Sequence, residues 1–95
     1  MAGSDDFGLA SPVYKNTTSS VLVKTGVGRV RGIFVASASN VPTLKLWDNT
    51  SAATTVLVNT FTPAGATYYE FGDVLFSTGL YLTVGGTVDC TVIYF

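Results

Sequence analysis

Short runs rich in β-branched and aromatic residues recur roughly every ten positions, and turn-forming residues separate them. Val, Thr, Tyr and Phe favour strands, whereas Gly, Pro, Asn and Asp favour the turns between strands. No segment shows the 3.6-residue repeat of an amphipathic helix. The pattern predicts an all-β fold: an antiparallel β-sandwich of eight to nine strands with jelly-roll or Greek-key connections.

The first twelve residues differ from the rest of the chain. They are mostly small or polar, with apolar side chains at Phe7 and Leu9, and Pro12 ends the segment. We expect residues 1–12 to form an arm and residues 13–95 to form one sandwich domain. The arm is either a frayed terminus or a segment that docks on a partner through Phe7 and Leu9. The expected strands cover residues 13–15, 20–25, 29–38, 43–47, 54–61, 67–71, 74–76, 80–84 and 87–95.

Charge and composition exclude several function classes. Only 12 % of the 95 residues are charged, against about 25 % in an average soluble protein. The net charge is −1, which argues against binding to the nucleic acid polyanion. Because the chain has no His and a single cysteine, Cys90, it lacks a Ser-His-Asp triad, a structural zinc site and an internal disulfide. We therefore expect no catalytic residues, no cofactor and no metal.

No targeting segment is recognisable in the sequence. No apolar run approaches the roughly 18 residues that would span a bilayer. The N-terminus has neither the basic start nor the apolar stretch of a signal peptide. We expect no membrane association and no export through a secretion signal.

Two segments are apolar on both faces of their expected strands. These are the second half of the run at 29–38 and residues 92–95. A two-layer sandwich of one chain covers only the inner faces of its sheets, so apolar outer faces need another layer. We expect that layer to be another copy of the chain, in a homo-oligomer. The expected interface residues are Ile33, Val35, Ile93 and Phe95.

A glycine-rich stretch at residues 26–32 superficially matches a phosphate-binding loop. Such a loop requires a helix directly after it, and here a β-branched run follows. We interpret the stretch as a turn followed by a strand glycine, Gly32, that faces a bulky neighbour. Arg29 and Arg31 project from the same side of this strand. They are either a solvated strand end or a contact for an acidic partner, which could include Asp5 and Asp6 of a neighbouring arm.

Carboxylates and aromatic side chains offer two weaker candidate sites. Calcium needs six or more oxygen ligands, so we interpret Asp48 and its neighbours as turn residues. The same holds for the carboxylates Glu70, Asp73 and Asp89. Large aromatic residues are usually core or interface residues, although they can also stack on sugar rings. The aromatic candidates are Trp47, Tyr68, Tyr69 and Tyr81.

The order of these segments resembles small virion proteins of tailed bacteriophages, especially those of cyanobacterial and other aquatic hosts. The strand followed by the Asp48-Asn49-Thr50-Ser51-Ala52 turn is the most recognisable part. The segments that carry the resemblance are residues 14–17, 28–35, 44–52, 59–65 and 79–87.

The resemblance implies a capsid cement or decoration protein without enzymatic activity, a β-sandwich homotrimer on the outer surface of the head. The resemblance also implies synthesis in the host cytoplasm and the major capsid protein as the partner. The alternative is a receptor- or glycan-binding module at the distal end of a tail fibre or tailspike. A small cytoplasmic enzyme is least favoured, because no acid/base constellation is visible. The expected capsid contacts are Phe7, Leu9, Arg29 and Arg31.

Overall fold

The computed structural model describes residues 11–95, and this part of the chain contains six β-strands and no helix. All strand pairs are antiparallel, which confirms the expected all-β antiparallel fold. Among these residues there is accordingly no helix that could cross a membrane. The strands are β2 (Val13–Thr17), β3 (Val21–Thr25), β4 (Gly28–Trp47), β5 (Val56–Phe61), β6 (Thr67–Phe76) and β7 (Gly79–Tyr94).

The prediction of eight to nine strands is wrong, because three pairs of expected strands are continuous. The merged runs are 29–38 with 43–47 in β4, 67–71 with 74–76 in β6, and 80–84 with 87–95 in β7. Residues that usually end a strand here only bend it. Asn40, Asp73 and Gly86 have positive φ angles of 59°, 58° and 67°. Pairing with the neighbouring strands resumes beyond each of these positions.

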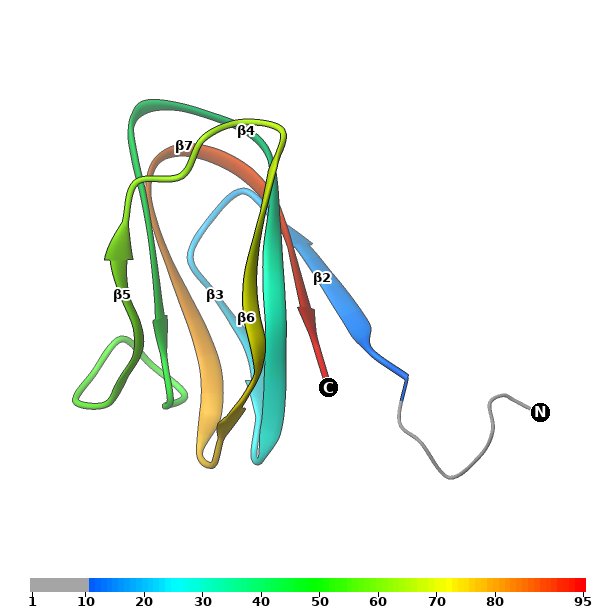
Figure 1. Cartoon of the computed structure of the whole chain (residues 1–95). Helices are drawn as coiled ribbons and strands as arrows, with labels where there is room; N and C mark the ends of the chain where they lie inside the picture. Colours follow the sequence, from blue (N-terminus) through cyan, green and yellow to red (C-terminus); the bar gives the residue numbers. More distant parts are fainter. Residues whose placement is uncertain (1–10) are drawn as a thin grey trace.

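β4 and β7 are the two central strands, and they pair with each other on both sides of a register shift between Ser39 and Thr43. Where β7 pairs with residues 30–39 of β4, β2 pairs with the other edge of β7 and β6 pairs with the other edge of β4. Where β7 pairs with residues 43–47 of β4, β3 pairs with the other edge of β7 and β5 pairs with the other edge of β4. Both long strands curve over together at one end of the molecule (Figure 1).

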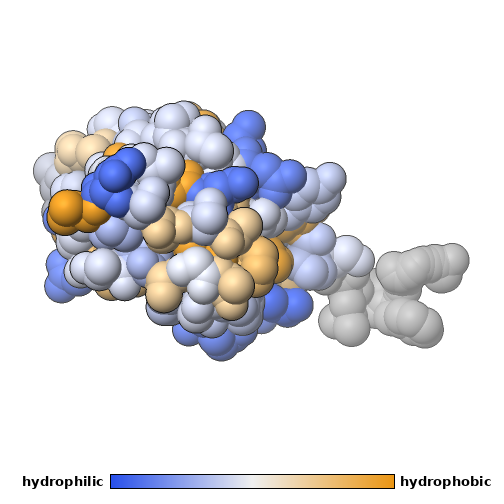
Figure 2. Space-filling view, turned by 90° about the horizontal axis from the view of Figure 1, so that it is seen from above, coloured by the Kyte–Doolittle hydropathy of each residue, from blue (hydrophilic) through white to orange (hydrophobic). Residues whose placement is uncertain are grey.

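The bends of β4 and β7 fit against each other. A methyl group on Gly86 would overlap the carbonyl groups of Asn40 and Val41, so the close approach requires glycine. The Asn40 side-chain amide donates a 3.0 Å hydrogen bond to the Thr87 hydroxyl across the bend. Seen from this end, the surface has small hydrophobic areas separated by hydrophilic ones (Figure 2).

One hydrophobic core joins both stretches of the two central strands. Its members include residues on each side of both bends, and side chains of β3, β5 and β6 pack against the two central strands. Burying one such side chain contributes about 1.5–3 kcal/mol. The buried residues are Val30, Ile33, Val35, Leu44, Leu46, Phe76, Leu80, Leu82, Val88, Cys90 and Val92.

Ile33 and Val35 belong to this core and are fully buried within the single chain. The prediction that these two side chains lie in an interface between chains is therefore wrong. The sequence pattern is apolar on both faces of the strand, but the inward face carries Ile33 and Val35. Phe34, the residue between them, is 40 % exposed and occupies the outward face.

Candidate binding groove and outer sheet face

A groove of about 730 Å³ lies where the turn between β3 and β4 meets the ends of β6 and β7. Three of its lining side chains are cationic: Lys24, Arg29 and Arg31. Its apolar lining comes from Val27, Leu75 and Phe95. Thus the two arginines that the sequence places on one side of a strand lie together in a concave surface.

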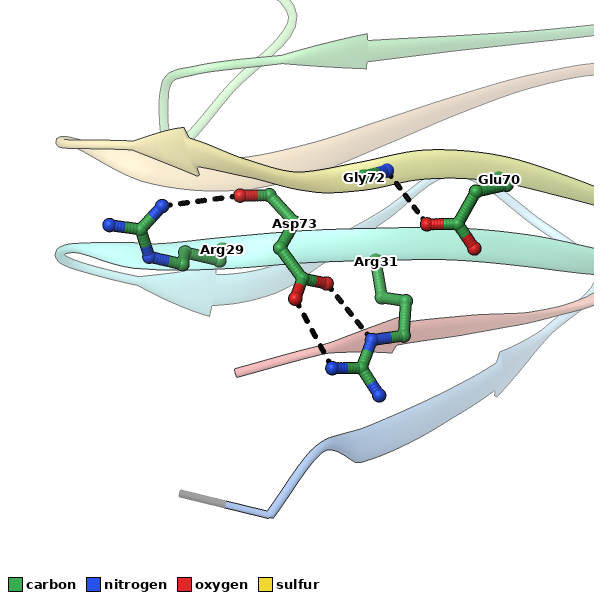
Figure 3. A network of polar contacts seen from close by, with 5 residues as sticks. All are labelled: Arg29, Arg31, Glu70, Gly72 and Asp73. Atoms are coloured by element: carbon green, nitrogen blue, oxygen red, sulfur yellow. Dashed lines mark hydrogen bonds and ion pairs between the residues drawn. The ribbon is translucent and has the colours of Figure 1, made fainter. Parts of the chain in front are cut away.

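Arg31 is held in a fixed position by two contacts. Its Nε donates a 2.9 Å hydrogen bond to Asp73 Oδ1, and its Nη2 donates a 3.2 Å bond to Oδ2 (Figure 3). The guanidinium carbon also lies 4.8 Å from the centre of the Phe95 ring, in cation–π geometry. The hydrogen bond from Arg31 is the main reason why the pKa of Asp73 lies below its ordinary value.

Arg29 and Lys24 keep charge available in the groove. Arg29 Nη1 donates a 3.3 Å hydrogen bond to the backbone carbonyl of Asp73, and Lys24 Nζ donates a 3.1 Å bond to the carbonyl of Phe95. Within residues 11–95, the pair of Arg31 and Asp73 is the only salt bridge. The groove therefore combines three cationic side chains with one acidic side chain, and it is suited to bind an anion.

Irregular pairing between β4 and β6 brings Asp73 to Arg31. The register of the two strands shifts between Val30 and Gly32, so Arg31 lies at the irregularity. On β6, the Glu70 carboxylate accepts a 2.8 Å hydrogen bond from the N–H of Gly72, directly before Asp73 (Figure 3). Such bulges often re-aim a side chain. In the sequence, the adjacent Gly72 and Asp73 predict a turn at this position. They do not predict the contact between Asp73 and Arg31.

The outward face next to the groove carries four large hydrophobic or aromatic side chains. Tyr14 pairs directly with Ile93, and Phe34 pairs directly with Tyr68, so each pair projects from one side of the sheet. The alternation along β4 and β7 places Phe34 and Ile93 opposite the core residues. Tyr14 is 70 % exposed and Tyr68 is 41 % exposed. We call these four residues the outer face.

The remaining interface and contact predictions have different outcomes. Ile93 is half-buried and belongs to the outer face, whereas Phe95 is half-buried and lines the groove. Phe7 and Leu9 lie outside the described residues. Lys24 and Leu75 also line the groove, and sequence reasoning missed them because their proximity depends on how distant strands pair.

Asp48, Trp47 and Tyr69, three of the candidates for metal or sugar binding, make structural contacts in the described part of the chain. No three His, Cys, Asp or Glu side chains among residues 11–95 are placed to hold a metal ion. The Asp48 carboxylate instead binds backbone N–H groups of the turn between β6 and β7. Trp47 donates a 2.8 Å hydrogen bond to Thr83, and Lys45 lies over its ring at 4.3 Å from the centre. Tyr69 packs against Phe61 with ring centres 5.0 Å apart.

Comparison with known protein families, curated proteins and solved structures finds no match to this chain.

Proposed function

We propose that the chain is a β-sandwich of jelly-roll type that serves as a structural protein of a phage virion. Its role is that of a capsid cement or decoration protein on the outer surface of the head. The apolar outer face carries the proposal, because an exposed sheet face with two tyrosines, Phe34 and Ile93 is suited to lasting contact with another protein surface. The resemblance to small phage virion proteins supports the same role.

The strand pairing supports the jelly-roll architecture. Dividing β4 and β7 at their bends gives two sets of four neighbouring segments. One set is β2, the later half of β7, the earlier half of β4, and β6. The other set is β3, the earlier half of β7, the later half of β4, and β5. Consecutive segments pass from one set to the other at every step except from the later half of β4 to β5, and this order supports a jelly roll.

The outer face provides the contact for a homotrimer. Phe34 and Tyr68 lie beside each other on β4 and β6, and Ile93 and Tyr14 continue the surface onto β7 and β2. Covering apolar side chains with a second chain removes them from water. A trimer matches the local three-fold positions of an icosahedral shell.

A clamp of this kind needs no reaction chemistry. It binds the assembled shell but not the separate capsid subunits, so its binding free energy favours the assembled state. Many identical copies, each joining neighbouring subunits, would brace the shell against the pressure of the packaged genome. A small domain without covalent cross-links fits this role.

Copy number in purified virions tests the location. Quantitative mass spectrometry should give hundreds of copies per particle, a number of the same order of magnitude as the copy number of the capsid protein. A few tens of copies or fewer would instead favour the tail-fibre module. The exposed rings of Tyr14 and Tyr68 are also compatible with stacking on sugar rings, which that rival function would use.

A substitution on the outer face tests the trimer. Phe34→Glu should convert the trimer to a folded monomer, measured by sedimentation velocity with circular dichroism as the check on folding. Val56→Glu is a matched control, because Val56 is 39 % exposed, compared with 40 % for Phe34, but lies on β5. A wild-type monomer at micromolar concentration, or a Phe34→Glu trimer, would contradict the proposed interface.

A further inference from the structure

The groove has the chemistry of a site for an acidic, partly apolar segment. The cationic side chains of Lys24, Arg29 and Arg31 outnumber the single acidic side chain, Asp73, so two of them lack an acidic side-chain partner among the lining residues. Exposed apolar side chains stand beside these charges, with Val27 at 62 % and Leu75 at 53 %. A suitable occupant therefore carries both carboxylates and hydrophobic side chains.

The first strand that the structure describes begins next to this groove. Val13, at the start of β2, pairs with Tyr94, which directly precedes the groove residue Phe95. Phe95 in turn exchanges backbone hydrogen bonds with Arg29, of 2.7 and 3.3 Å. Residues 5–9 precede Val13 by only four to eight positions. At about 3.3 Å per extended residue, these positions reach about 13–26 Å from Val13.

We propose that the groove binds residues 5–9 of the same chain, the sequence Asp5-Asp6-Phe7-Gly8-Leu9. The two carboxylates match the excess charge of Arg29 and Lys24, while Arg31 keeps its partner Asp73. The side chains of Phe7 and Leu9 match the apolar lining at Val27 and Leu75. A segment tethered this close to its site has a high effective concentration, so the chain's own segment has an advantage over the same segment of another copy.

Paramagnetic relaxation enhancement in the full chain tests the proposal. A nitroxide is attached to Ser4→Cys, and the buried Cys90 is left in place, with a single label per chain confirmed by mass spectrometry. The amide signals of Gly28, Arg29 and Leu75 should lose most of their intensity. The amide signals of Val41 and Thr87, at the bends, should be unchanged.

Charge-matched variants show whether the contact is specific. Arg29→Gln should restore most of the lost intensity, whereas Lys15→Gln, which removes one cation from β2, should not. Raising the ionic strength from about 0.1 M to about 1 M shortens the Debye length from about 10 Å to about 3 Å, so it should also restore intensity. Absence of broadening at the groove, or equal broadening in the Arg29→Gln variant, would overturn the proposal.

A mixed sample identifies the chain that supplies the segment. Spin-labelled chains without nitrogen-15 are mixed with unlabelled chains that carry nitrogen-15, so any broadening then comes from a neighbouring copy. The groove signals should stay sharp in this mixture. Broadening in the mixture but not within one chain would overturn the same-chain assignment. The measurement uses the isolated protein, so its result is independent of whether the protein decorates capsids.

Discussion

The carboxylate of Asp48 accepts a 2.8 Å hydrogen bond from the backbone N–H of Thr78, thirty residues further along the chain. The N–H of Ser77 donates to the same carboxylate at 3.0 Å, and the N–H of Gly79 donates at 3.4 Å. Asp48 directly follows β4, and these donors lie at the turn between β6 and β7. One side chain therefore anchors the connection between two strands to the end of a third.

We predict that Asp48→Asn destabilises the fold by about 1–3 kcal/mol. The amide of asparagine carries no charge, and its NH2 group cannot accept the hydrogen bonds that the backbone N–H groups donate to the carboxylate. Urea unfolding followed by circular dichroism measures the loss. Asp89→Asn serves as the control, since Asp89 is exposed and its side chain makes no hydrogen bond among residues 11–95. Equal stability of the two variants would contradict a structural role for Asp48.

Acid should destabilise the protein through the same carboxylates. Burial raises the pKa of Asp48, but hydrogen bonds from Thr78, Ser77 and Gly79 outweigh burial and lower the pKa overall. The pKa of Asp73 is lowered mainly by its hydrogen bond from Arg31. A carboxylate with a lower pKa in the folded state adds stability above the unfolded pKa of about 3.9, and that stability is lost as the pH falls through the folded value.

The urea midpoint should therefore change little between about pH 7 and 5 on account of these two groups, and it should fall below about pH 4. Asp48→Asn should show a smaller fall across the acid range, because one of the linked groups is gone. A wild-type midpoint that stays constant down to pH 3 would show that these carboxylates have the same pKa in both states.

Gly32 should tolerate no side chain. A methyl group there would overlap the Tyr68 ring and the backbone carbonyl of Tyr69, which confirms the interpretation of Gly32 as a strand glycine facing a bulky neighbour. We predict that Gly32→Ala costs about 1–3 kcal/mol, since the backbone carbonyl cannot move aside without disturbing the pairing of β4 with β6. Gly65→Ala is the control, because a methyl group there would have its nearest contact at 3.4 Å. Comparable thermal unfolding of the two variants would contradict this prediction.

The sequence predicts the strand runs well because their signal is local. Alternation and turn residues mark where each run begins. The merging of runs is not local. Asn40 continues β4 because Gly86 lets β7 bend beside it, and neither residue alone indicates that fit. For the same reason, the pattern shows that Ile33 and Phe34 lie on opposite faces but does not indicate which face turns inward.

The groove was predictable only in part. A spacing of two residues on a strand places Arg29 and Arg31 on one side, and both line the groove. The partner of Arg31 was not predictable, because Asp73 reaches it through a register shift between β4 and β6. Lys24 lies beside the two arginines because the end of β3 is close to Phe95, whose main-chain oxygen accepts a hydrogen bond from Lys24. This contact depends on how β3, β7 and β4 pair with one another.

Cys90 should be protected from thiol reagents as long as β2 stays paired. Its side chain is 1 % exposed, and its thiol donates a 3.7 Å hydrogen bond to the carbonyl of Thr17, the residue that pairs with it on β2. Burial, with a smaller contribution from Asp89, raises the pKa of the Cys90 thiol to about 11. The reactive thiolate is therefore scarce at pH 8. We predict that the native protein does not react with Ellman's reagent at pH 8 and reacts with one equivalent in concentrated urea. Rapid reaction of the native protein, without unfolding by circular dichroism, would mean that β2 detaches from β7 on its own.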